Sequence, residues 1–157
     1  CRSLRRLTTA AVALPVAELR DGSCVELSFG GRLPSVADAA VVGALLVDCC
    51  ERSSLETLEL SRRAEPDADA DDGRFAEALG HLADAQRRRP SPLREVRLCR
   101  TDLSSSAEAA AALADLVGAC PQLTTLDLTE AQLGHPVGGR PVSALSLLAA
   151  ALTASAA

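Results

Sequence analysis

LTTLDLTEAQL, from Leu123 to Leu133, is the stretch that decides the predicted fold. Its leucines stand at positions 123, 126, 128 and 133. In an extended segment alternate side chains share a face, so we expect Leu126 and Leu128 to point into a core and Asp127 to point toward solvent. One such strand cannot bury its own apolar face, and the pattern therefore predicts copies of itself stacked alongside.

Copies of this pattern occur upstream. The clearest are LETLEL from Leu55 to Leu60 and LREVRL from Leu93 to Leu98, and CVELSF from Cys24 to Phe29 fits the same inward positions. We therefore predict strands near residues 24–29, 55–60, 93–98 and 123–128. The first nine residues, CRSLRRLTT, repeat the phase of Cys120 to Leu128. They predict an additional strand with a degenerate form of the pattern, called the worn strand below. No helix-length apolar pattern follows it, and Pro15 interrupts the next short apolar run.

Helix patterns alternate with the predicted strands. We expect Ser35 to cap a helix through about Cys50, Asp72 to precede one from about Arg74 to Arg88, and Ser105 with Glu108 to form a capping box ahead of Ala109 to Ala119. Strands joined by crossover helices are parallel. Stacked units of this kind predict a curved α/β solenoid with parallel strands on the concave face and helices on the convex face. The expected core stripes of the second and third helices are Phe75, Leu79 and Leu82, and Ala109, Leu113, Leu116, Val117 and Cys120.

A lead-in, a strand and a helix follow one another in residues 14–46, LPVAELRDGSCVELSFGGRLPSVADAAVVGALL. The LPVxxLR lead-in, the strand and the alanine- and valine-rich helix resemble ribonuclease-inhibitor-like leucine-rich repeat proteins of protists, although Leu33 falls one residue early for that pattern. The resemblance implies a single leucine-rich repeat domain over residues 1–157, with about four repeats and the worn N-terminal one. It also implies a non-catalytic protein–protein interaction module, an accessory or scaffold subunit of a larger complex.

Composition narrows the choice of partner. The chain contains no Lys, Asn, Ile or Met, which indicates a GC-rich genome, and its net charge is -5 with 1% aromatic residues. A nucleic-acid partner is therefore disfavoured. The six cysteines include no CxxC pair. We expect reduced, buried thiols, which favour a reducing intracellular compartment. Because the chain opens on Cys1, we expect a piece of a longer polypeptide.

No segment reaches the ~20 apolar residues that a membrane span needs. The closest is Val142 to Ala157, where apolar residues recur at helical spacing and a second stripe is polar. We predict an amphipathic packing helix there. Its expected apolar stripe is Val142, Leu145, Leu148, Ala149 and Leu152, and its polar stripe is Ser143, Ser146 and Thr153.

The insertion at residues 62–73, RRAEPDADADDG, is an acidic loop with alternating aspartates. Its spacing departs from a calcium-binding loop, since Gly73 is one place late and Ala78 stands where the closing Glu belongs. A calcium-responsive regulator remains an alternative, as does the recognition arm of a longer enzyme. Arg88 to Ser91 matches a basophilic kinase site, but a helix end stopped by proline accounts for the same residues. Because the sequence lacks nucleophile and cofactor motifs, we expect no enzyme and no cofactor or metal.

The outward positions of the predicted strands are the candidate binding surface. Equivalent positions in a parallel sheet are neighbours, so Glu59, Arg97 and Asp127 should form an alternating charge ladder, with Arg94 and Arg100 on the same or adjoining positions. We predict that these five residues bind a protein partner on the concave face. The alternatives are that the charges only neutralise one another in solvent, or that the helices or the acidic loop dock the partner.

Overall fold

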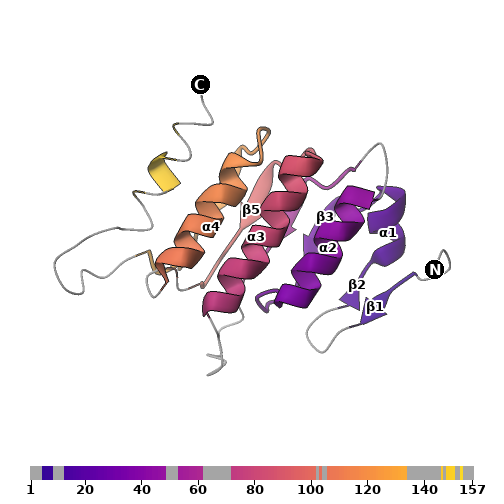
Figure 1. The fold of residues 1–157 in the computed structure, drawn as a ribbon, viewed down its shortest axis with the longest axis horizontal. Helices are drawn as coiled ribbons and strands as arrows, with labels where there is room; N and C mark the ends of the chain where they lie inside the picture. Colours follow the sequence, from indigo (N-terminus) through magenta and orange to yellow (C-terminus); the bar gives the residue numbers. More distant parts are fainter. Residues whose placement is uncertain are drawn as a thin grey trace.

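A computed structural model describes residues 5–8, 13–48, 53–61, 72–101, 103, 106–133, 146, 148–150 and 153, and its fold is α/β (Figure 1). One parallel sheet holds four strands in the order β3-β4-β5-β6. They are β3 (Glu26–Ser28), β4 (Thr57–Glu59), β5 (Glu95–Arg97) and β6 (Thr125–Asp127). Leu27, Leu58, Val96 and Leu126 lie side by side in the register. The predicted strands, their direction and their alignment are confirmed.

Three helices form a row over one face of this sheet (Figure 1). They are α2 (Val36–Asp48), α3 (Asp72–Arg88) and α4 (Ala107–Gly118), and α3 packs between the other two. The predicted core stripes of α3 and α4 are buried, with every member at most 5% exposed. The α2–α3 contact is close at Gly43, where a Cβ atom would lie 3.2 Å from the carbonyl oxygen of His81.

The helix starts confirm one prediction and correct two others. Ser35 and Asp38 form a reciprocal box: the Asp38 N–H donates to Ser35 Oγ (3.1 Å), and Ser35 Oγ donates to Asp38 Oδ2 (2.7 Å). The prediction that Ser105 caps the third helix is wrong, because Ser106 is the N-cap and its Oγ accepts from the Ala109 N–H (3.1 Å). The first turn of α4 therefore begins one residue later than the Ser105–Glu108 spacing implies. The start of α3 also differs from the prediction, because Asp72 lies inside this helix rather than before it.

The N-terminal strand is not a fifth member of the parallel sheet in the described residues. β1 (Leu7–Thr8) pairs antiparallel with β2 (Ala13–Leu14) in a separate sheet, and α1 (Val16–Asp21) follows directly after Pro15. Parallel pairing needs a crossover of about a dozen residues. The segment between β1 and β2 is too short for that, so these two strands pair antiparallel. The other predicted inward positions of the worn strand, Cys1, Leu4 and Thr9, lie outside the described residues.

The core is continuous from α1 to α4, and its cover thins at β6. Leu58, Leu60, Val96 and Leu98 are at most 3% exposed, whereas the equivalent leucines of β6 are only partly buried. In the first repeat Cys24, Leu27 and Phe29 all point inward, so its register is resolved despite the early Leu33.

The C-terminal prediction is confirmed in part. Leu148 is helical and buried, as predicted, but Ala149 is exposed and not packed. Ser146 and Thr153 are exposed, in agreement with the predicted polar stripe. Val142, Leu145, Ser143 and Leu152 lie outside the described residues, as do residues 62–71 of the acidic insertion. Across the described ranges, no helix is long and apolar enough to cross a membrane.

Candidate functional site

The solvent face of the sheet carries two rows of polar side chains, because the strands are in register. One row is Glu26, Thr57, Glu95 and Thr125, and the next is Ser28, Glu59, Arg97 and Asp127. Neighbouring members of a row are ~4.8 Å apart across the strands. The predicted neighbourhood of Glu59, Arg97 and Asp127 is therefore confirmed.

Arg97 makes its direct ion pairs within the other row. Its Nε and Nη2 donate to the two carboxylate oxygens of Glu95 at 2.8 and 2.9 Å, and its Nη1 donates to Glu26 at 3.4 Å. The hydrogen bond to Glu95, and then the charges of Glu95, Glu26 and Glu59, raise the pKa of Arg97. The expected ladder is thus wrong in its pairing. The long side chain of Arg97 reaches the other row, to Glu95 on its own strand and to Glu26 beyond β4, instead of its register neighbours Glu59 and Asp127.

Asp127 closes the end of β6. Its Oδ1 accepts hydrogen bonds from the hydroxyl and the backbone N–H of Thr129, and these bonds hold the pKa of Asp127 below its usual value. A thiol hydrogen bond from Cys99 and the charge of Arg97 lower this pKa further. The main role of Asp127 in the described structure is to fix the turn that follows the strand.

A left-handed turn follows three of the strands at one repeat position. Gly31, Arg100 and Glu130 each lie four residues beyond the aligned core residue and have φ values of 79°, 61° and 58°. For Arg100 and Glu130 this conformation costs about 1–2 kcal/mol. Their side chains pair, with Arg100 Nε 2.7 Å from Glu130 Oε2. These left-handed residues therefore change the direction of the chain at the carboxyl ends of the strands, and two of them place a charged pair there.

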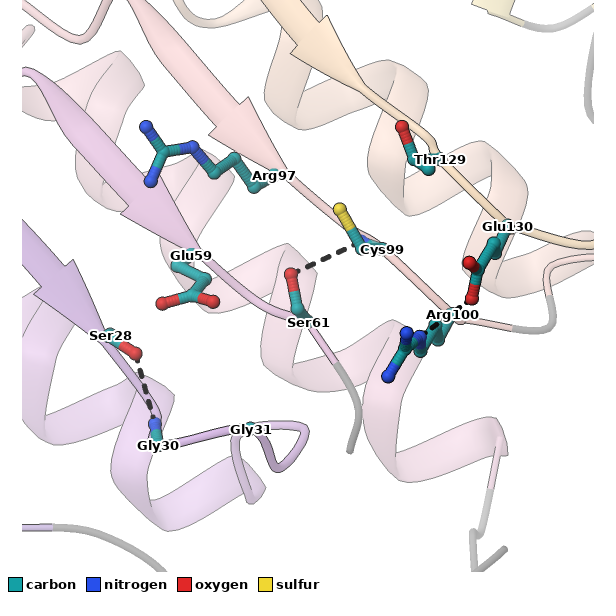
Figure 2. Close-up of a pocket in the computed structure, with 10 residues that line it drawn as sticks. All are labelled: Ser28, Gly30, Gly31, Glu59, Ser61, Arg97, Cys99, Arg100, Thr129 and Glu130. Carbon is teal, nitrogen blue, oxygen red and sulfur yellow. Dashed lines mark hydrogen bonds and ion pairs between the residues drawn. The ribbon is translucent and has the colours of Figure 1, made fainter. Parts of the chain in front are cut away.

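An open groove of about 520 Å³ lies at these carboxyl ends (Figure 2). It brings together three of the five predicted site residues, Glu59, Arg97 and Arg100. Arg94 is not among them, because it precedes β5 at the opposite end of the strand, where its carbonyl accepts from the backbone of Thr124 and Thr125. The other lining residues are Ser28, Gly30, Gly31, Ser61, Cys99, Thr129 and Glu130.

Sequence reasoning missed one row of the groove. Gly30, Ser61, Cys99 and Thr129 occupy a single repeat position, three residues beyond the aligned core residue. The backbone N–H of Cys99 donates to Ser61 Oγ at 3.2 Å, which ties two members of this row together. Extending the register by two residues past the end of each observed strand, which is one residue past each predicted strand, would have found them.

The described cysteines, Cys24, Cys99 and Cys120, are free thiols. Cys24 and Cys120 are buried, and desolvation raises the pKa of their thiols to about 11 and about 12. Cys99 is half-buried and lines the groove. The described residues include no cluster of three or more metal-ligating side chains, and Asp67, Asp69 and Asp71 of the calcium alternative lie outside them.

The kinase alternative at Ser91 is contradicted by burial. Ser91 is 3% exposed, and its Oγ exchanges hydrogen bonds with the side-chain amide of Gln86. The neighbouring arginines have structural partners: Arg87 pairs with Asp84 and Asp115, and Arg89 donates to the carbonyl of Val47 at 3.0 Å. These contacts support a structural role for the arginine cluster.

No family model, curated protein or solved structure matches this chain. The two rows of polar side chains on the sheet and the groove are therefore the features that indicate a function.

Proposed function

We propose that this chain is a leucine-rich repeat module of the solenoid type that binds a protein partner on its strand face, as an accessory or scaffold subunit of a larger assembly. The repeat architecture is supported by four aligned parallel strands, of which β3, β4 and β5 are each followed by a helix in the described residues. The Leu spacing places one inward residue of each unit against its neighbours. Such units contact mainly the unit before and the unit after.

The observation that carries the proposal is the open, charged groove on the strand face. Arg97 stands near its edge, held by Glu95 and Glu26 and still 37% exposed. Arginine is over-represented among residues that anchor protein interfaces, and a guanidinium already fixed by carboxylates loses little freedom on binding.

The charges of the face favour binding over catalysis. General acid–base work at neutral pH needs a group whose pKa lies near 7. Here the pKa of Arg97 is raised and that of Asp127 is lowered, so the shifts hold both groups more firmly in their charged forms. A fixed pattern of charge suits recognition of a complementary surface.

Arg97→Ala tests the docking face. Its ion pairs are exposed, so its loss should cost at most ~1 kcal/mol of folding stability. Loss of an interface anchor should weaken partner binding by ~2 kcal/mol or more. The measurement is calorimetric melting beside capture of the native partner, followed by hydrogen exchange of the recovered complex to locate the protected strands.

Arg88→Ala is the matched control, since Arg88 is an exposed arginine on α3. We expect it to capture the partner normally. Normal capture by Arg97→Ala together with loss by Arg88→Ala would move the docking site to the helix face, where a hollow of about 260 Å³ lies between α2 and α3.

A further inference from the structure

The two arginines of the groove are already neutralised by neighbouring carboxylates. Arg97 is shared between Glu95 and Glu26, and Arg100 is paired with Glu130. Glu59 is different: in the part of the chain that the structure describes, no hydrogen bond or ion pair joins its carboxylate to another residue. The groove therefore presents one carboxylate without a direct partner.

Glu59 stands over a floor of small residues. Figure 2 shows its carboxylate toward Ser28 and Gly30, with the guanidinium of Arg97 on its other side. A Cβ atom at Gly30 would meet nothing within 4 Å, so the space above this backbone is open. Ser28 Oγ and Ser61 Oγ each accept one backbone N–H, from Gly30 and Cys99, and a hydroxyl oxygen has a second acceptor site.

The charges of the sheet face add up to a negative surface. Glu26, Glu59 and Glu95 outnumber Arg97, the Arg100–Glu130 pair is neutral, and the whole chain has a net charge of -5. A negative groove attracts a basic side chain and repels an acidic one. The acceptor oxygens around Glu59 match the several donors of a guanidinium or an ammonium group.

We propose that this groove binds an arginine or lysine side chain on an extended segment of the partner protein, with Glu59 as its counter-charge. The inference rests on the proposed function and specifies the chemistry of the partner. The small floor of Gly30, Gly31 and Ser61 admits the backbone of that segment, and the carboxylate of Glu59 holds its cation.

A peptide titration tests this assignment directly on the full chain. The probe is an acetylated and amidated hexapeptide of Gly and Ser with a single Arg, and its matched control carries citrulline, which has a similar shape without the charge. We expect the amide signals of Gly30, Ser61 and Cys99 to shift saturably with the Arg peptide. Citrulline should weaken binding by about tenfold or more, the effect of losing a charge-assisted hydrogen bond.

Two variants of equal net charge locate the counter-charge. Glu59→Gln should weaken the Arg peptide to the level of the citrulline peptide, while Glu77→Gln, on the exposed side of α3, should leave its affinity unchanged. Equal affinity for both peptides, no saturable shift, or full binding by Glu59→Gln would each overturn the inference.

The partner capture described above separates this inference from the proposed function. Loss of capture by Arg97→Ala with normal capture by Glu59→Gln would refute the basic-side-chain assignment and leave the docking face in place. Normal capture by both variants would refute both.

Discussion

The inner strand β5 and the outer strand β6 carry the same leucine pattern but reach different degrees of burial. Val96 in β5 and Leu98 directly after it are 0% exposed, whereas Leu126 in β6 and Leu128 directly after it are only partly buried. β5 has a paired strand on each side, and β6 is the last strand of the sheet among the described residues. In this fold the pattern determines which way a side chain points, and the neighbouring units determine how completely it is covered.

The largest expected effect is a buried charge at the aligned position of the two strands. Val96→Asp should abolish cooperative thermal unfolding, because an unpaired carboxylate cannot be accommodated in a sealed core. Leu126→Asp should keep a cooperative transition at a lower melting temperature, since its side chain can reach water. Circular dichroism measures both. Equal loss in the two variants would mean that β6 is as enclosed as β5.

Truncation of leucines gives a graded version of the same comparison. Leu98→Ala should lower the free energy of unfolding by about 2–5 kcal/mol, as expected for a fully packed leucine. Leu128→Ala should cost about half of that or less, because part of its surface is already in water. Urea unfolding of the two variants checks this ratio, and a larger loss at Leu128 would contradict the burial order.

The caps of α2 and α4 test whether these two helices, which flank α3, depend on local bonds to the same degree. Ser106→Ala and Ser35→Ala should each cost about 1 kcal/mol, because each removes the acceptor for a helix N–H. Ser105→Ala serves as the control for α4 and should change stability by less than about 0.5 kcal/mol. If Ser105→Ala were the more damaging variant, the start of α4 would lie where the capping-box spacing first placed it.

The smallest expected effect is a pH dependence that arises at Asp127 in β6. The folded-state pKa of Asp127 is lowered by Thr129, so its contribution is present above the unfolded pKa of about 4 and is lost as the pH falls through the folded value. Arg97, at the same position of β5, stays charged throughout. Asp127→Asn should flatten the loss of stability between neutral pH and acid in urea titrations, and Thr129→Val should do so too. An unchanged acid slope in both would show that other carboxylates control it.

The strands and their alignment were predictable because they depend on local rules. Alternation assigns Val96 to the core and Arg97 to solvent, and the equal spacing of leucines then fixes which residues of different strands are neighbours. The groove row of Ser61 and Cys99 follows from the same register. The predicted cap of α4 was ambiguous for a similar local reason, since three consecutive serines precede this helix.

Other features depend on choices that a spacing rule does not contain. Arg97 has carboxylates within reach in two rows, and its rotamer decides in favour of Glu95 and Glu26. Arg100 and Glu130 adopt a left-handed backbone that their residue types do not announce, unlike Gly31. β1 pairs antiparallel with β2 although its leucines repeat the phase of the parallel strands, and the short connection accounts for the direction of that pair.

Gly43 connects the helix side of the molecule to the shape of its strand side. Paired strands are ~4.8 Å apart and packed helices ~8–10 Å apart, so a layer with one helix for each strand can stay joined only by curving toward the strands. The absence of a side chain at Gly43 lets α2 and α3 pack closely, since a Cβ atom there would lie 3.2 Å from the carbonyl oxygen of His81. Close packing of these helices limits the curvature expected of the layer at β3 and β4. A bulkier residue there should push α2 and α3 apart, which would increase the curvature of the sheet and narrow the opening beside Glu59 from the opposite side of the sheet.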